Sequence, residues 1–279
     1  MTARTATLER FDVDRPVVGM VHLPALPGAP NFEGGRDAVR SRALDDARRL
    51  EAGGIDGIIV ENFGDAPFYP EDVPTHVVAE LTAIATALTD AVDVPVGINV
   101  LRNDAAAALS IAAAADAEFV RVNVHVGTAA TDQGVLEGRA HETLRLRDRL
   151  ETDVAILADV HVKHATPIGD SDIERAALEA IERGNADGVI VSGPGTGVET
   201  AITDVERVNG ALSDRTGPAV PVFVGSGVTG DTVGDCFDAG ADGVIVGTAL
   251  KTDDVTTNPV SQARVADLVT AARDADSND

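Results

Sequence analysis

Side chains that can take up and release protons stand beside several short apolar segments of this chain. Glu61 follows the apolar residues 57–60, Asp159 lies within the segment 155–162, and Lys163 comes directly after that segment. Carboxylates and a desolvated amine are groups that enzymes use for proton transfer. We therefore predict Asp159, Lys163 and Glu61 as catalytic residues that move protons or stabilise an enolate.

Lys163 is one of two lysines, the other being Lys251, among 22 basic residues. Because arginine replaces lysine almost everywhere else, a retained lysine suggests amine chemistry that a guanidinium cannot perform. The amine would be a proton or electrostatic group, which we favour, or a Schiff-base nucleophile toward a carbonyl. A structural alternative is a buried ion pair of Asp159 with Lys163 that only locks the fold. A buried pair of Glu61 with Arg121 would have the same effect.

Two glycine-rich segments near the C-terminal end predict a phosphate site. Gly225-Ser-Gly-Val-Thr-Gly and Gly247-Thr-Ala-Leu-Lys each follow an apolar run. Glycines let the backbone approach a ligand and point successive N–H groups at one oxyanion, although short loops alone would also need them. Thr229 would cap the next helix, whose positive N-terminus favours a dianion, and Lys251 would add charge there or lie on the surface. The residues predicted to bind phosphate are Gly225, Ser226, Gly227, Gly247 and Thr248.

Further polar residues are expected to contact the rest of the ligand. His22, Asn99 and Asn123 lie at or near the ends of apolar runs, and we predict that they orient substrate hydroxyls. Ser192 and Gly193 begin the segment Ser192-Gly-Pro-Gly-Thr-Gly. This segment would wrap the ligand, cover it as a lid, or merely connect two elements. We therefore predict these five residues as substrate-binding.

Histidines close to these positions raise the question of a metal. His161 and His164 flank Lys163 and could join Asp159 or Glu61 around a divalent ion. No HxH or HExxH pattern with a supporting third ligand is present, however. We predict no metal and no cofactor.

The elements that must position these residues follow one repeated pattern. A short apolar run precedes polar or glycine-rich residues and then an amphipathic segment, which indicates βα units and a parallel sheet. The predicted strands are Val17–His22, Gly57–Asn62, Val96–Asn99, Phe119–Val124, Ala155–Val162, Gly188–Val191, Val222–Gly225 and Gly243–Val246. The predicted helices are Arg36–Ala52, Pro74–Ala91, Asp104–Ala114, Gly138–Leu150, Ser171–Arg183, Val198–Ser213, Thr229–Ala239 and Pro259–Asp274.

Eight such units favour a closed barrel over an open doubly wound sheet, which usually has fewer strands. Glycines at helix ends, as in Asp238-Ala-Gly-Ala-Asp-Gly, suit the tight connections at the bottom of a barrel. We predict a single α/β domain over residues 1–279, a (β/α)8 TIM barrel with short polar tails at 1–14 and 275–279. Paired loops after strands seven and eight are the usual phosphate site of such barrels.

Alternation along each strand predicts which residues face the interior. Met20 and His22 share one face of their strand, and Arg121 and Asn123 share another. A third inward-facing set comprises Leu157, Asp159, His161 and Lys163. Inward-facing residues at the carboxyl ends of the strands line the mouth of a barrel. We expect these polar groups to form a pocket there.

The composition excludes several classes of protein. The chain carries 46 acidic and 22 basic residues, a formal net charge of −24, and 44% of its residues are hydrophobic. Periodic apolar segments argue against a disordered acidic protein, and the lack of a basic stripe argues against nucleic acid as a partner. We interpret the acidic surface as an adaptation to concentrated salt, in which surface repulsion is screened.

Other features bear on location and partners. No apolar run reaches 18 residues, and residues 1–14 are too polar for a signal peptide, so we expect a cytoplasmic protein without membrane contact. We expect Cys236, the one cysteine, to be buried on a helix. The expected partners are a phosphorylated small molecule and further copies of the chain, because barrels often form homo-oligomers.

Six segments together resemble the BtpA/SgcQ family. The resemblance spans nearly the whole chain and implies a barrel of the ribulose-phosphate-binding type, here in a haloarchaeal-like member. The family takes its name from a cyanobacterial factor for photosystem I biogenesis, while its sugar-operon members suggest a carbohydrate enzyme. The segments are Val18-Gly-Met-Val-His-Leu-Pro-Ala-Leu-Pro-Gly-Ala-Pro, Asp56-Gly-Ile-Ile-Val-Glu-Asn-Phe-Gly-Asp-Ala-Pro-Phe, Gly97-Ile-Asn-Val-Leu-Arg-Asn-Asp, Phe119-Val-Arg-Val-Asn-Val, Ala158-Asp-Val-His-Val-Lys-His-Ala and Val224-Gly-Ser-Gly-Val-Thr.

Two functions follow from the residues and the resemblance. The first is an enzyme that isomerises, epimerises or cleaves a small phosphorylated sugar or nucleoside-derived metabolite. The alternative is an assembly or regulatory protein that retains a phosphate-ligand pocket. A charged pocket favours the first, and the name of the family favours the second.

Overall fold

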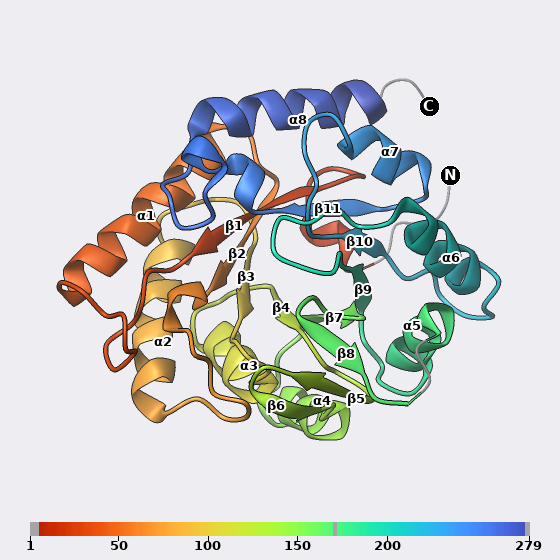
Figure 1. Ribbon diagram of the computed structural model, residues 1–279, viewed down its shortest axis with the longest axis horizontal. Helices are drawn as coiled ribbons and strands as arrows, with labels where there is room; N and C mark the ends of the chain where they lie inside the picture. The colour runs from red at the N-terminus through yellow and green to blue at the C-terminus, as the bar shows by residue number, and fades with distance from the viewer. Residues whose placement is uncertain (1–5, 170–171, 277–279) are drawn as a thin grey trace.

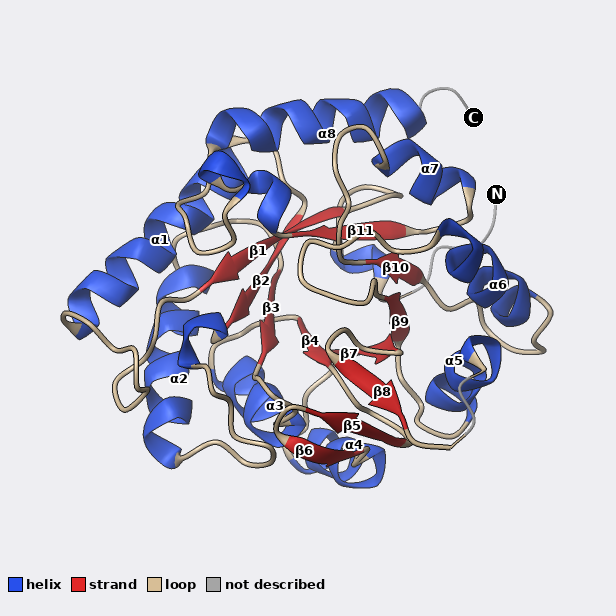
Figure 2. Cartoon of the chain, viewed as in Figure 1, coloured by secondary structure: helices blue, strands red, loops and turns tan. Residues whose placement is uncertain are grey.

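The chain forms a closed barrel of parallel strands surrounded by helices (Figures 1 and 2). The computed structural model describes residues 6–169 and 172–276, and within them eight strands close in the order β1-β11-β10-β9-β7-β4-β3-β2. The strands are β1 (Val17–His22), β2 (Gly57–Glu61), β3 (Val96–Asn99), β4 (Phe119–Val122), β7 (Ala155–Val160), β9 (Gly188–Val191), β10 (Val222–Val224) and β11 (Gly243–Val246). The predicted (β/α)8 TIM barrel is confirmed.

A helix follows each barrel strand and covers the outside of the sheet. These helices are α1 (Arg36–Ala52), α2 (Thr75–Thr89), α3 (Ala105–Ala114), α4 (Ala140–Arg149), α5 (Ile173–Glu182), α6 (Ile202–Ser213), α7 (Val233–Asp238) and α8 (Gln262–Asp276). Most bounds lie within two residues of the predicted ones. The largest differences are at the starts of α6 and α7, each four residues after the predicted start, and residues 225–232 form a loop before α7.

Three short strands that the sequence analysis did not predict form an antiparallel sheet beside the barrel mouth. They are β5 (Thr128–Thr131), β6 (Gly134–Glu137) and β8 (Ala165–Pro167), paired in the order β6-β5-β8. In Figure 2 this small sheet lies next to α4. Each strand has only three or four residues, too few for alternation to stand out from the surrounding loop.

β7 ends at Val160, two residues before its predicted end. His161 has a φ of +54°, which breaks the extended backbone directly after the strand. The chain then turns into the loop that carries Lys163 and continues to β8. The break moves Lys163 off the strand and onto a loop over the mouth.

Apolar side chains fill the barrel below the mouth. Val18, Met20, Ile59, Phe119, Leu157, Ile190, Phe223 and Ile245 form this interior cluster together with Leu8 and Phe11. The Phe11 ring lies 5.7 Å from Phe119 and 6.2 Å from Phe223 between centroids. Buried apolar side chains in segment 1–14 close the bottom of the barrel, so its described part is not a free polar tail.

Cys236 lies in α7 and is buried, as expected. Burial, together with the neighbouring carboxylate of Asp235, raises the pKa of its thiol to about 11. The reactive form of cysteine is the thiolate, so this side chain contributes packing rather than chemistry.

Candidate functional site

Polar side chains form a layer on top of the apolar barrel interior. Pairing of β1, β2 and β3 places His22 opposite Glu61, and Glu61 opposite Asn99. Met20 and Ile59, two residues before His22 and Glu61, face the apolar interior. The inward alternation therefore continues from apolar to polar residues at the carboxyl ends of these strands.

Arg121 and Asp159 form a buried bidentate ion pair across β4 and β7. Arg121 Nε donates to Asp159 Oδ2 at 3.0 Å, and Arg121 Nη2 donates to Asp159 Oδ1 at 2.9 Å. Burial alone would lower the pKa of Arg121, but the charge and hydrogen bonds of Asp159 outweigh it and hold that pKa above its usual value. The guanidinium is thus fixed in its charged form at the mouth.

Two further donors complete the surroundings of the Asp159 carboxylate. Asn123 Nδ2 donates to Oδ2 at 2.7 Å, and Ser192 Oγ lies 2.9 Å from Oδ1 and 2.7 Å from the Gly225 carbonyl oxygen. The buried ion pair therefore joins Asp159 to Arg121 and not to Lys163. A carboxylate with this many donors is built to hold Arg121 in place.

His22 and Glu61 form a second buried pair. His22 Nε2 lies 3.8 Å from Glu61 Oε1, and both side chains are almost fully buried. Within the described part of the chain, neither Glu61 oxygen nor His22 Nδ1 has a hydrogen-bond partner, and the same holds for Asn99 Oδ1. Buried polar atoms are normally paired, so this cluster is an unusual polar feature of the barrel mouth.

The electrostatic surroundings keep His22 neutral. Burial and the positive charges of Lys251, Lys163 and Arg121 lower the pKa of its imidazole well below 6.5, while the Thr256 backbone acts in the opposite direction. The Phe63 ring packs against the imidazole, with ring centroids 4.9 Å apart. At neutral pH His22 is therefore available to accept a proton.

Lys163 is buried at the mouth without an ion pair. Burial lowers the pKa of its ammonium; Glu61 and Asp159 raise it, and Arg121 and Arg102 lower it further. None of the salt bridges formed by the described residues includes Lys163. A buried amine of this kind is suited to proton transfer or to stabilising an oxyanion.

Arg102 is a functional candidate that the sequence analysis missed. Its side chain is buried, and its Nη2 donates to the Lys163 carbonyl oxygen at 2.5 Å. The residue belongs to one of the segments that carry the family resemblance, but it follows a strand end by three residues and shows no alternation. Only the fold brings Arg102 against the loop of Lys163.

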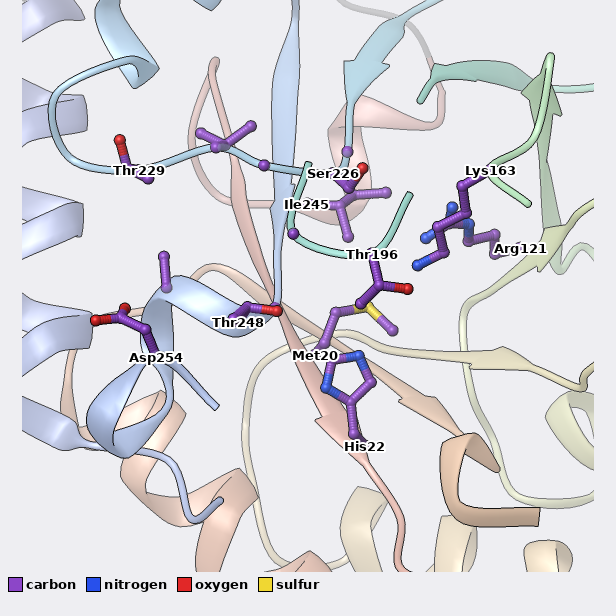
Figure 3. A pocket seen from close by; sticks show the side chains of 16 residues that line it. Met20, His22, Arg121, Lys163, Thr196, Ser226, Thr229, Ile245, Thr248 and Asp254 are labelled. Carbon is purple, nitrogen blue, oxygen red and sulfur yellow. The ribbon is translucent and has the colours of Figure 1, made fainter. Parts of the chain in front are cut away.

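A cavity of about 290 Å³ opens at the mouth between these groups and the glycine-rich loops. Figure 3 shows Lys163 and Arg121 on one side of it, Thr229, Thr248 and Asp254 on the other, and His22 below. Five predicted residues lie outside its lining, namely Glu61, Asp159, Asn99, Asn123 and Ser192, and two of these, Asp159 and Asn123, line a second cavity instead. The lining residues are Met20, His22, Arg121, Lys163, Thr196, Gly197, Gly225, Ser226, Gly227, Val228, Thr229, Ile245, Gly247, Thr248, Ala249 and Asp254.

The five residues predicted to bind phosphate all line this cavity. Gly227 has a φ of +74°, and a Cβ there would lie 2.3 Å from Glu199 Cα, so only glycine fits. A Cβ on Gly247 would lie 2.8 Å from His22 Cε1, so this glycine makes room for the imidazole. Ser226 Oγ lies 3.0 Å from the carbonyl oxygens of Gly195 and Val198. The hydroxyl is therefore engaged within the protein, and we expect the backbone N–H group of Ser226 to bind a ligand.

Thr229 is not the helix cap that the sequence predicted. α7 begins at Val233 with Thr232 as its N-cap residue. The Thr229 N–H donates to Thr232 Oγ1 at 3.0 Å inside the preceding loop. The additional loop turn separates the glycines from the helix start, so a phosphate here would rely on loop N–H groups.

The β9–α6 loop contributes different residues from those predicted. A Cβ on Gly193 would lie 2.4 Å from the Val198 carbonyl oxygen, so Gly193 serves a tight turn. Thr196 and Gly197 line the cavity instead. His164 Nε2 lies 3.1 Å from Thr196 Oγ1 and ties this loop to the loop that carries Lys163.

Lys251 lies neither on the surface nor at the phosphate loops, which corrects both expectations. Its side chain is fully buried, and its Nζ donates to the Met20 carbonyl oxygen at 2.8 Å. The nearest carboxylate is Asp46, 3.9 Å away. Burial lowers the pKa of Lys251 to about 8, although Asp46 raises it.

The two histidines considered as metal ligands lie in different surroundings, and His161 shares the lining of its cavity with Asp159. His161 lines a separate cavity between α5 and the small sheet, and His164 contacts Thr196. In residues 6–169 and 172–276, no group of three or more His, Cys, Asp or Glu side chains is arranged to hold a metal ion.

Comparison with known proteins identifies relatives along nearly the whole chain. The sequence profile of the BtpA family matches residues 13–274. The photosystem I biogenesis protein BtpA of Synechocystis is 47% identical over 263 residues, 94% of this chain and 90% of that protein. An uncharacterized protein of Thermococcus kodakarensis is 48% identical, over 93% of this chain and 96% of that protein. The putative sgc region protein SgcQ of Escherichia coli is 31% identical, over 94% and 95%.

These relatives come from a cyanobacterium, an archaeon and an enteric bacterium, and they give no support to the expected haloarchaeal-like character. That expectation rests on the composition of this chain. Among the helices that the structure describes, none combines the length and the apolar character needed to cross a bilayer.

Solved structures with the same fold share little sequence. A thiamine phosphate pyrophosphorylase from Pyrococcus furiosus superposes with a TM-score of 0.56 at 15% identity, covering 94% of this chain and 96% of that one. The N-(5'-phosphoribosyl)anthranilate isomerase of the same organism gives 0.56 at 14% identity, covering 93% and 99%. At these identities the similarity shows the barrel fold.

Proposed function

We propose that this chain, which belongs to the BtpA family, is an enzyme acting on a small phosphorylated sugar or nucleoside-derived metabolite. One observation carries the proposal: a single cavity joins the glycine-rich loops after β10 and β11 to Lys163, Arg121 and His22. Glycine loops at this position of a barrel suit a phosphate, and the polar end suits a reacting carbonyl or hydroxyl.

The chemistry proposed is proton transfer next to a carbonyl. His22 would take a proton from the substrate, forming an N–H bond and leaving the electron pair on the substrate as an enolate. Lys163 and Arg121 would stabilise the resulting oxyanion, and Glu61 would act through His22 as the counter-charge of the imidazolium. Isomerisation, epimerisation and aldol-type cleavage share such an enolate.

This proposal redistributes the predicted roles. Glu61 and Asp159 do not line this cavity but contact His22 and Arg121, which do, so they position His22 and Arg121 respectively. Lys163 keeps the electrostatic role, because the ammonium lies at the cavity without a counter-ion. Solved neighbours whose names include phosphorylated compounds support a phosphate ligand in this fold.

Exchange of carbon-bound hydrogen in D2O tests the proposal before the product is known. Aldose and ketose phosphates are incubated with the protein in D2O, and loss of 1H NMR signals next to the carbonyl is followed. We expect catalysed exchange for at least one compound and its loss in Lys163→Met and His22→Asn. Binding of these phosphates without any exchange would favour a sensor or assembly protein.

The second candidate function is an assembly or regulatory role, favoured by the name of the Synechocystis relative. Such a protein would keep the cavity for a ligand that controls a partner surface. It needs the phosphate loops but has no need of a buried carboxylate behind His22. For such a protein, Glu61→Gln would leave ligand and partner binding intact. The enzyme proposal instead requires that Glu61→Gln lose catalysed exchange in D2O.

We also propose that the acidic composition adapts the chain to concentrated salt. The net charge of −24 produces repulsion that dilute buffer leaves unscreened. Screening at molar salt shortens the range of this repulsion to about 3 Å. The folded state would then gain stability from salt.

A further inference from the structure

The cationic end of the cavity, defined as Lys163 and Arg121, lacks a matching anion. Asp159 engages Nε and Nη2 of Arg121, which leaves Nη1 without a hydrogen bond among the described residues. Lys163 forms no salt bridge with any described residue, although it lines the cavity and is 8% exposed.

The carboxylates near these cations have partners other than Lys163. Asp159, Glu61 and Asp132 are the carboxylates whose charges act on the cluster of Arg102, Arg121 and Lys163. Asp159 is bound to Arg121 and Glu61 faces His22, so neither forms a salt bridge with the Lys163 ammonium. A buried charge without a partner is costly, so the site is arranged to receive an anion at this end.

This anion is distinct from the phosphate bound by the glycine loops. In Figure 3, Lys163 and Arg121 lie across the cavity from Thr229 and Thr248, so a phosphate on the loops leaves them facing the remainder of the ligand. A carboxylate brings one negative charge to this end, whereas a second phosphate would bring about two, next to the carboxylates of Asp159 and Glu61. A carboxylate on a short chain therefore suits this end better than a second phosphate.

We propose that the substrate carries a carboxylate as well as a phosphate, and that Lys163 and Arg121 bind the carboxylate. The inference rests on the proposed phosphate site and narrows the substrate to phosphorylated hydroxy or keto acids. A guanidinium already fixed by Asp159 presents its free edge without further ordering, and the adjacent ammonium adds charge. In a keto acid this placement brings the carbonyl beside His22 and Lys163, where the proton transfer is proposed.

Paired ligands that differ at one group test the proposal in the intact protein. 3-Phosphoglycerate and glycerol 3-phosphate share the phosphate and the chain, and a carboxylate in the first replaces a hydroxymethyl group in the second. Titration calorimetry in 1 M KCl is expected to show at least tenfold tighter binding of 3-phosphoglycerate. Inorganic phosphate and a two-carbon bisphosphate complete the series, and the bisphosphate is expected to bind more weakly than 3-phosphoglycerate.

The two lysines of the chain provide a matched pair of variants. Lys163→Met is expected to remove the preference for 3-phosphoglycerate while leaving the affinity for glycerol 3-phosphate within about threefold. Lys251→Met removes a lysine that lies outside the cavity and is expected to keep the preference. Should Lys163→Met fail to fold, the comparison of the two ligands on the wild-type protein still decides the question.

The outcomes separate this inference from the proposed function. Equal affinities for the two ligands would overturn the carboxylate subsite and leave the phosphate site standing. Tighter binding of the bisphosphate would overturn the carboxylate in favour of a second phosphate. An equal loss of affinity for every ligand in Lys163→Met would assign Lys163 to the phosphate and also overturn the inference. If none of the ligands binds, both proposals are wrong.

Discussion

The imidazole of His22 and the carboxylate of Glu61 face each other across β1 and β2, with His22 Nε2 3.8 Å from Glu61 Oε1. Only His22 lines the cavity, and both Glu61 oxygens lack other hydrogen-bond partners among the described residues. A buried carboxylate behind a cavity-lining histidine stabilises the imidazolium that forms on proton uptake.

Glu61→Gln removes this counter-charge and keeps the shape of the side chain. We expect the pKa of His22 to fall further below 6.5, because the imidazolium then lacks the carboxylate that lies 3.8 Å from Nε2. The pH dependence of hydrogen–deuterium exchange at the His22 imidazole carbon, followed by mass spectrometry, measures this pKa. Glu182→Gln on the exposed side of α5 is the control, and an unchanged or raised pKa in Glu61→Gln would refute the pairing.

Asp159→Asn tests the structural role of the buried ion pair. The substitution leaves Arg121 charged, buried and without its partner, which we expect to lower the free energy of unfolding by about 3 kcal/mol. Ser192→Ala removes a single donor to the same carboxylate and is expected to cost about 1 kcal/mol. Urea denaturation in molar KCl measures both changes, and equal small losses would show that Asp159 does not hold Arg121.

The lowered pKa of Lys251 predicts that the stability of the protein changes with pH in the alkaline range. Its pKa is about 8 in the folded chain against 10.5 for the free side chain. Between these two values the lysine is protonated in the unfolded chain and neutral in the folded chain. The free energy of unfolding therefore rises as the pH increases from about 8 to 10.5. A difference of 2.5 pKa units corresponds to about 3 kcal/mol, fully gained only above pH 10.5.

The difference between wild type and Lys251→Met isolates this contribution. Titration of the Cys236 thiol acts in the opposite direction in the same pH range, because burial raises its pKa to about 11. That effect is common to both proteins and cancels in the difference. The free energy of unfolding of wild type minus that of Lys251→Met, measured by denaturation at pH 7.5 and 10, should rise with pH if Lys251 is responsible, and a constant difference would exclude it.

Salt dependence tests the interpretation of the acidic surface. Between 0.01 and 0.1 M KCl the Debye length falls from about 30 Å to about 10 Å, which weakens repulsion before salt-specific effects set in. We expect the melting temperature to rise across this range and to continue rising toward 1 M. Sorbitol at equal osmolality is the control. A melting temperature independent of KCl would exclude the salt adaptation.

Periodicity alone predicts the barrel and much of its mouth. Short β-branched runs such as Val17–His22 recur between helical segments, and alternation places Met20 inside and His22 above it. The same logic fails at Lys251, because burial of a lysine against the Met20 carbonyl depends on a contact between residues 231 positions apart. It also fails for Arg102 and for the small sheet, whose positions depend on loop paths that local patterns do not encode.

Ion-pair partners could not be predicted for a related reason. The sequence predicts that four charged residues lie at or close to strand ends: Arg121, Asp159, Glu61 and Lys163. Which of them form ion pairs depends on side-chain geometry across the mouth. In the fold, Arg121 reaches Asp159 in bidentate fashion and Glu61 faces His22. Among the residues that the structure describes, no carboxylate then forms a salt bridge with Lys163.

Binding of inorganic phosphate to the loops after β10 and β11 tests the central claim most directly. Titration calorimetry in 1 M KCl compares wild type with Ala249→Asp, which adds a carboxylate at the cavity lining, and with Ala266→Asp on the exposed face of α8. Wild type and Ala266→Asp are expected to bind phosphate equally, and Ala249→Asp is expected to bind at least tenfold more weakly. No binding by wild type, or equal binding by Ala249→Asp, would contradict it.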